Sequence, residues 1–228
     1  SRNEHFKKFE LSKENHLELA QLCKKNLVGY AASVWHEDFF PWVDDYLDFY
    51  KIGSGDLTAY PLLKKIAEIG KPILLSTGLA TEIEVIESIK FIQKINLNYM
   101  KAGRLALLQC TSMYPITYSD AHLNVMDRFR EITRISHVGY SDHTEGIEAS
   151  IVAVALGAKI IEKHITTNKN LPGPDHKASI TEKELKDLIS KIRNVETILG
   201  NDKKEPSKSE KKNIKIARNS LVANSKIK

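Results

Sequence analysis

The feature that most constrains the fold is a regular alternation of short apolar runs with longer segments of helical spacing. Each run is rich in residues that favour β-strands, and each intervening segment repeats its apolar residues at three- and four-residue steps. This alternation predicts parallel strands joined by helical crossovers, and therefore either a doubly wound sheet or a barrel. The six predicted strands cover residues 27–33, 48–53, 72–77, 105–111, 137–141 and 160–166.

The polar residues at the strand ends decide between these two folds. Ser, Thr, Asp or His residues follow the carboxyl ends of five of the six predicted strands. A doubly wound sheet gathers its site at one switch point, whereas a closed barrel gathers residues from many strand ends around one mouth. The sequence therefore predicts an α/β fold of the TIM (β/α)₈ barrel type, with six of the eight strands visible and the first two missing.

The end of the predicted barrel is marked by the last long helical segment. Thr181 and Glu184 form a capping box that predicts where this helix begins, and Gly200 stands where a C-terminal cap is expected. We therefore assign residues 1–200 to the barrel domain and residues 201–228 to a basic tail.

The positive charge of the chain is concentrated in that tail. The net charge is +5, yet residues 201–228 contain nine Lys or Arg and three Asp or Glu, which leaves −1 for residues 1–200. The tail has no interleaved aromatic residues and no recognition-helix motif. We therefore expect a solvated linker and no nucleic-acid partner.

Composition excludes a membrane protein and favours a water-soluble globular one. The chain is 42% hydrophobic and 28% charged, and no run approaches the roughly 20 apolar residues that cross a bilayer. We therefore expect no membrane partner. Cys23 and Cys110 lie far apart without a metal-type spacing, which favours a reducing, cytoplasmic location.

Two histidines at strand ends are candidates for a metal site. Strand periodicity places Ser141 and His143 on one face of their strand, and Glu162 and His164 on one face of the next. Two imidazoles with oxygen ligands suit a divalent transition metal. Two structural histidines held by hydrogen bonds explain the same spacing, so both interpretations stay open at this point.

Lysine, serine and glycine residues at neighbouring strand ends predict an anion site. Lys51 supplies positive charge, and the turns after two strands, around Ser54 and Ser76, expose backbone N–H groups and hydroxyls. The alternative is a set of ordinary glycine turns beside a lysine that reaches out to solvent. Asp175 lies on a loop shaped by Gly and Pro, where it either orients a hydroxylated substrate or caps the loop.

Seven short motifs occur in one order along the chain, and together they resemble the N-acetylneuraminate (sialic acid) synthase family. Members of that family have a TIM barrel that condenses phosphoenolpyruvate with an N-acetylhexosamine such as N-acetylmannosamine and releases phosphate. The resemblance implies that activity here, with Mn²⁺ or Mg²⁺ as cofactor and a homodimer for the full-length protein. The motifs lie at residues 50–56, 75–78, 108–115, 139–144, 162–164, 173–179 and 206–210.

The resemblance also implies a role for individual residues, carried over by position. It gives no role to Glu162, which stays open. Ser112 stands where some members carry Asn, and residues 31–35 differ from the commoner Ser-Thr-Pro-Phe type. The implied phosphoenolpyruvate contacts are Lys51, Ser54, Ser76, Ser141, Ser112 and Ser33; the implied metal ligands are His143 and His164; the residues implied to face the sugar are Asp56, Tyr114 and Asp175.

Family members carry two further strands before the matched region and a small antifreeze-like domain after it. We therefore expect residues 1–200 to be a partial synthase barrel and residues 201–228 to lead toward such a domain. We also expect the chain by itself to be weakly active or inactive. A synthase for legionaminic acid, or less favourably pseudaminic acid, is the alternative enzyme, and a non-catalytic barrel fragment that acts as a scaffold is the alternative of another class.

Overall fold

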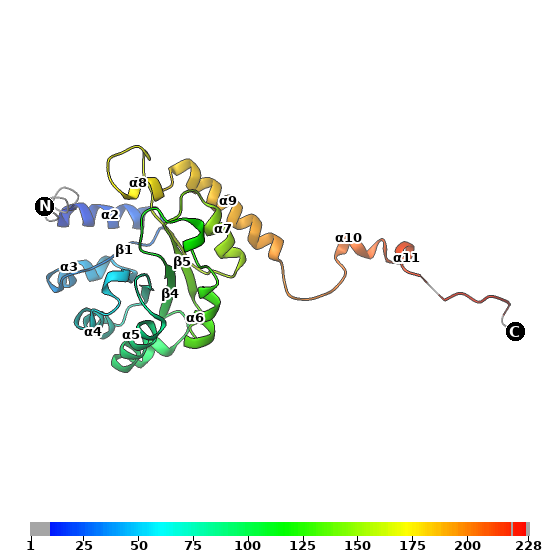
Figure 1. The fold of residues 1–228 in the computed structure, drawn as a ribbon, viewed down its shortest axis with the longest axis horizontal. Helices are drawn as coiled ribbons and strands as arrows, with labels where there is room; N and C mark the ends of the chain where they lie inside the picture. The colour runs from blue at the N-terminus through cyan, green and yellow to red at the C-terminus, as the bar shows by residue number, and fades with distance from the viewer. Residues whose placement is uncertain (1–9, 220, 227–228) are drawn as a thin grey trace.

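The computed structural model describes residues 10–219 and 221–226, and its centre is one six-stranded parallel sheet (Figure 1). The predicted first strand is shorter in the structure, because Asn26 ends the preceding helix and Leu27 then adopts a positive φ of 55°. The strands are β1 (Ala31–Ala32), β2 (Phe49–Ile52), β3 (Ile73–Ser76), β4 (Leu105–Cys110), β5 (Val138–Asp142) and β6 (Ile161–Lys163).

The strand order distinguishes between the two folds that the sequence allows. Every strand pairs in parallel with the next one along the chain, in the order β1-β2-β3-β4-β5-β6. A doubly wound sheet would reverse its order at a switch point. The six strands instead curve into a half-barrel, which confirms a barrel-like α/β fold; the closed eight-stranded form stays a prediction.

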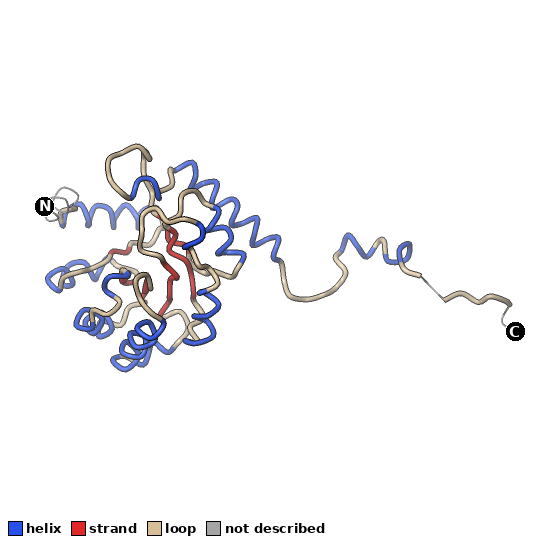
Figure 2. The backbone as a smooth tube through the Cα atoms, in the orientation of Figure 1, coloured by secondary structure: helices blue, strands red, loops and turns tan. Residues whose placement is uncertain are grey.

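Helices surround this half-barrel on its outer side (Figure 2). Helix α4 is capped by Gly70, whose φ of 83° suits glycine because it has no Cβ atom. Within the described residues, no helix combines the length and the apolar character that a membrane crossing requires. The helices are α2 (Lys13–Lys25), α3 (Phe40–Val43), α4 (Tyr60–Ile69), α5 (Glu82–Ile95), α6 (Val125–Thr133), α7 (Glu148–Ala155), α8 (Asp175–Ala178), α9 (Glu182–Leu199), α10 (Lys208–Lys211) and α11 (Ile214–Ala217).

The hydrophobic core lies between the sheet and these helices. Leu63 of α4 and Ile92 of α5 are fully buried, as are Leu75, Leu107 and Tyr140 of the strands. Successive side chains of a strand point to opposite faces, so the residues between these apolar positions point into the half-barrel. Lys51, Ser76, Ser141 and Glu162 are among the strand residues on this inner face.

The last helix of the domain begins and ends where the sequence predicts. The side chain of Thr181 accepts a hydrogen bond from the backbone N–H of Glu184, and α9 ends at Leu199 before Gly200, which has a φ of 58°. Beyond it, α10 and α11 lie away from the half-barrel (Figure 1). The assignment of residues 201–228 as a linker stays a prediction.

Candidate functional site

Four polar residues from four strands meet inside the half-barrel near the carboxyl ends of the strands. The Nζ atom of Lys51 donates to Ser76 Oγ at 2.9 Å and lies 3.4 Å from Glu162 Oε2. The hydroxyl of Ser141 donates to Glu162 Oε1 at 2.7 Å. We call Lys51, Ser76, Ser141 and Glu162 the Lys51 cluster. It unites three residues predicted to hold an anion with a glutamate whose role the sequence leaves open.

Two further predicted serines gather around Gly78, next to this cluster. The backbone N–H of Gly78 donates to Ser54 Oγ at 3.0 Å, and Ser54 Oγ lies 3.6 Å from the sulfur of Cys110. A Cβ atom on Gly78 would lie only 2.3 Å from Ser112 Oγ, so the two serines approach this turn because it carries no side chain. Small hydroxyl and amide donors therefore line one side of the site.

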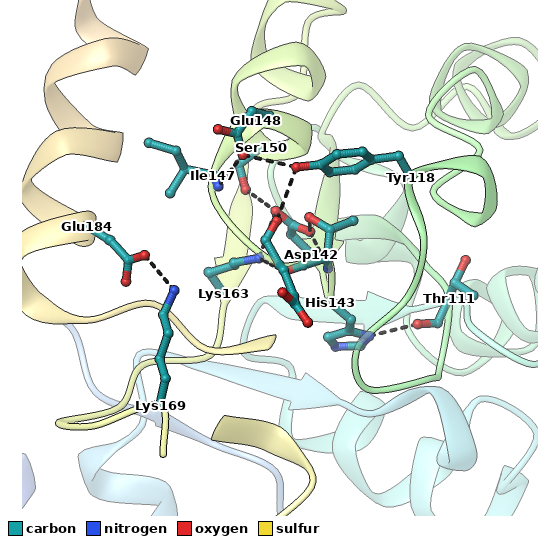
Figure 3. A network of polar contacts seen from close by, with 12 residues as sticks. Thr111, Tyr118, Asp142, His143, Ile147, Glu148, Ser150, Lys163, Lys169 and Glu184 are labelled. Carbon is teal, nitrogen blue, oxygen red and sulfur yellow. Dashed lines mark hydrogen bonds and ion pairs between the residues drawn. The ribbon is translucent and has the colours of Figure 1, made fainter. Parts of the chain in front are cut away.

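The two histidines converge as their strand positions predict. The ring centroids of His143 and His164 are 5.4 Å apart, and the ring of Tyr114 lies 4.1 Å from the first and 5.3 Å from the second. The Nδ1 atom of His143 lies 2.8 Å from the carbonyl oxygen of Thr111 (Figure 3). Because a carbonyl only accepts, Nδ1 carries a proton, and Nε2 is the nitrogen that can bind a ligand when the ring is neutral.

These rings are partly buried, and burial shifts their pKa values. Burial lowers the pKa of His164, and the neighbouring His143 lowers it further, so the ring of His164 is neutral at neutral pH. Burial raises the pKa of the Tyr114 hydroxyl to about 12, so this hydroxyl stays protonated and can donate a hydrogen bond. Burial opposes the charged form of His143, but its hydrogen bonds with Cys110 and with the carbonyl of Thr111 raise the pKa of that ring overall. The rim therefore presents the neutral ring of His164 and the protonated hydroxyl of Tyr114 beside the charged Lys51 cluster.

The donor chemistry of the pair fits two ligands of a divalent metal. A neutral imidazole with a fixed tautomer is a common metal ligand. In the part of the chain that the structure describes, no group of three or more His, Cys, Asp or Glu residues is placed to hold a metal ion. His143 and His164 would therefore need further ligands, such as water or oxygen atoms of a substrate.

Three further residues predicted to belong to the site, Asp56, Asp175 and Ser33, lie on loops or helix ends that follow the strands. Asp56 follows β2, and burial raises the pKa of its carboxyl. Asp175 begins α8, and its charge contributes to raising the pKa of Tyr114 and opposes the lowering of the pKa of His164. Ser33 follows the short strand β1 and is exposed, and no described contact joins it to the other site residues.

A buried polar network beside His143 is a feature that sequence reasoning missed (Figure 3). Asp142 Oδ2 lies 3.1 Å from Lys163 Nζ, and both side chains are almost completely buried. Ser150 donates to the same carboxylate at 2.6 Å, and the backbone N–H and hydroxyl of Thr144 donate to it at 2.8 Å each. The pair ties β5 to β6 directly beside His143. Strand alternation alone, which points Asp142 away from the site, could have indicated it.

The fold and the rim together define a partial barrel of parallel strands with a polar site at the carboxyl ends of the strands, the side on which such barrels carry their active sites. Residues 1–204 match the NeuB family, and the chain belongs to this family.

Proteins similar to this chain agree with that assignment. N,N'-diacetyllegionaminic acid synthase of Campylobacter jejuni is 42% identical over 97% of this chain and 65% of its own length. N-acetylneuraminate-9-phosphate synthase of Mus musculus is 34% identical over 89% of this chain and 55% of its own length. The crystal structure of the N-acetylneuraminic acid synthetase of Leptospira borgpetersenii has a TM-score of 0.81 and 31% identity, and the match covers 91% of this chain and 70% of that one. The chain thus spans about two thirds or less of the two curated relatives.

Proposed function

We propose that this chain is the barrel portion of a nonulosonic acid synthase, which joins phosphoenolpyruvate to the open-chain aldehyde of an N-acetylated hexosamine and releases phosphate. The observation that carries the proposal is the position of the Lys51 cluster beside the imidazoles of His143 and His164 on one rim. A synthase of this kind needs an anion site and an electrophile site next to each other, because two substrates must meet.

The anion site suits phosphoenolpyruvate because this molecule carries two anionic groups. Lys51 supplies the positive charge, and Ser76 and Ser141 supply hydroxyls at short range. Ser54 and Ser112, with the turn at Gly78, supply small polar groups for a second anionic group. Such donors also stabilise the charge that develops on the departing phosphate. Ser33 is retained in the proposal only as a contact implied by the family resemblance.

The aldehyde would lie near the two histidines. A divalent cation such as Mn²⁺ or Mg²⁺, held by His143 and His164, would polarise the aldehyde oxygen when bound. Tyr114, which packs against both rings, and Asp56 and Asp175 would orient the hydroxyl groups of the sugar. C3 of phosphoenolpyruvate then forms the new C–C bond with the aldehyde carbon, whose oxygen takes up a proton. A water molecule adds at C2 and loses a proton, and phosphate leaves from the resulting tetrahedral carbon as the C2 hydroxyl becomes a ketone.

The comparisons favour a diacetamido hexose as the sugar. The relative named for diacetyllegionaminic acid is more similar to this chain than the mouse relative named for N-acetylneuraminate 9-phosphate. N-acetylmannosamine, the expectation from the motifs, is the second candidate, and the fold similarity to the Leptospira synthetase supports it. The two sugars differ by one acetamido group, and the motifs do not distinguish the pocket shapes that the two sugars require.

We also propose the wider setting of the domain. Residues 1–200 would form the barrel, and residues 201–228 would be a linker to a further domain of the full-length protein. That protein would be a cytoplasmic homodimer without a nucleic-acid or membrane partner.

An assay of phosphate release by the full-length protein tests this proposal. Phosphoenolpyruvate and Mn²⁺ would be supplied with either the diacetamido hexose or N-acetylmannosamine, and the product mass would be determined. Turnover of the diacetamido sugar supports the first choice, and turnover of N-acetylmannosamine alone supports the second. A folded protein that binds neither phosphoenolpyruvate nor Mn²⁺ would instead be a scaffold.

A further inference from the structure

We propose that Glu162 is a built-in competitor of the anionic substrate, and that it sets the affinity of the Lys51 cluster for anions. The inference rests on the proposed function, because it takes phosphoenolpyruvate as the anion. It assigns a role to a residue for which neither the motifs nor the strand pattern gave one.

The geometry of the carboxylate carries the inference. Its two oxygen atoms contact two different donors: Oε2 lies 3.4 Å from Lys51 Nζ, and Oε1 accepts from Ser141 Oγ at 2.7 Å. A bound phosphate or carboxylate group would use the same two donors in the same bidentate manner. Glu162 therefore occupies the position that an anion between Lys51 and Ser141 requires.

The ion pair between Lys51 and Glu162 differs from an ordinary surface ion pair in its burial and in its position. The side chain of Lys51 is only 15% exposed, and that of Glu162 is 35% exposed. The two residues come from β2 and β6, which do not pair with each other, so the contact spans the interior of the half-barrel. Lys51 Nζ is also hydrogen-bonded to Ser76 at 2.9 Å. The lysine is thus held in place with its charge balanced by Glu162.

Displacement of Glu162 has a direct consequence for the affinity of the site. An incoming anion must replace both contacts of the carboxylate and then tolerate a like charge nearby, which costs affinity. A small anion that contacts only Lys51 and Ser141 regains no more than the carboxylate already supplied. A larger anion that also contacts Ser54 and the turn at Gly78 gains further hydrogen bonds. Phosphoenolpyruvate is such an anion, whereas inorganic phosphate, the proposed product, is smaller.

Isothermal titration of phosphoenolpyruvate, and separately of inorganic phosphate, into the full-length protein tests the inference. Glu162→Gln keeps the size of the side chain and removes its charge, so the dissociation constants for both anions should fall about tenfold. Glu162→Met is a second uncharged variant with the same expectation, should the first not fold. Glu68→Gln, on the exposed side of α4 and paired with Lys64, removes one negative charge elsewhere and should leave both constants unchanged.

The sign of the change distinguishes the outcomes. If Glu162 merely holds Lys51 in position, the folded uncharged variants will bind both anions as weakly as the wild type or more weakly, and the inference is wrong while the anion site stands. If the folded wild type and the variants all fail to bind phosphoenolpyruvate, the proposed function and the inference fall together.

Discussion

The imidazole of His143 is held by the backbone of the neighbouring strand loop, with Nδ1 2.8 Å from the carbonyl oxygen of Thr111. The same loop also donates a hydrogen bond to His143, since the N–H of Ile116 donates to the carbonyl oxygen of His143 at 3.0 Å. The ring is therefore fixed in one tautomer and one orientation, with Nε2 available as a ligand atom.

Removal of either imidazole should weaken cation binding. We expect His143→Ala or His164→Ala to reduce Mn²⁺ affinity at least about tenfold in the full-length protein, because each would remove one of two nitrogen ligands. Titration followed by electron paramagnetic resonance measures the free ion directly. His137→Ala, next to the opposite end of β5, is the matched control. Unchanged Mn²⁺ affinity in both site variants would mean that the pair is structural.

A methyl group at Gly78 should damage the anion site while sparing the fold. The added Cβ would lie 2.3 Å from Ser112 Oγ and 2.8 Å from Ser54 Oγ, so both hydroxyls must turn away. We expect Gly78→Ala to weaken phosphoenolpyruvate binding at least about tenfold, with little change in thermal stability. Gly55→Ala is the control, because its Cβ meets nothing within 4 Å. Equal binding by both variants would place the anion elsewhere.

The buried pair of Asp142 and Lys163 should be important for stability. Asp142→Asn or Lys163→Met leaves one partner of a buried ion pair uncompensated, which costs about 3–5 kcal/mol in the free energy of unfolding. Urea denaturation measures the difference. Lys186→Met, which breaks the exposed pair with Glu182, should have a much smaller effect. Similar losses in the buried and exposed variants would contradict the predicted cost of burial.

The stability that Glu184 contributes at the first turn of α9 should depend on pH. Hydrogen bonds from Lys169 and from the backbone of Thr181 lower the pKa of Glu184 from 4.5 to about 2. Because the folded pKa is the lower one, this stabilisation is present above pH 4.5 and is lost as the pH falls toward 2. The stability difference between the wild type and Glu184→Gln should therefore shrink between pH 5 and pH 3. A constant difference over that range would be contrary to the pKa shift.

Local sequence patterns predicted the strands and the polar residues at their carboxyl ends, because both depend on residues that are close together in the sequence. Strand periodicity placed Ser141 with His143, and Glu162 with His164, on one face of each strand, whereas the direction of the Lys51 side chain was left open. The role of Glu162 was not predictable in this way, since its partner Lys51 lies on a strand with which β6 does not pair. The length of β1 was also missed, because the positive φ of Leu27 has no sequence signature in an apolar residue.

Phosphate release from phosphoenolpyruvate by the full-length protein, compared between wild type and Lys51→Met, tests the central claim most directly. The measurement would be made with Mn²⁺, with and without the diacetamido hexose or N-acetylmannosamine. We expect release only when a sugar is present, and a loss of at least about a hundredfold in kcat/KM in the folded Lys51→Met variant. Release that does not depend on sugar, or that continues undiminished without the Lys51 ammonium group, would contradict a synthase site at this rim.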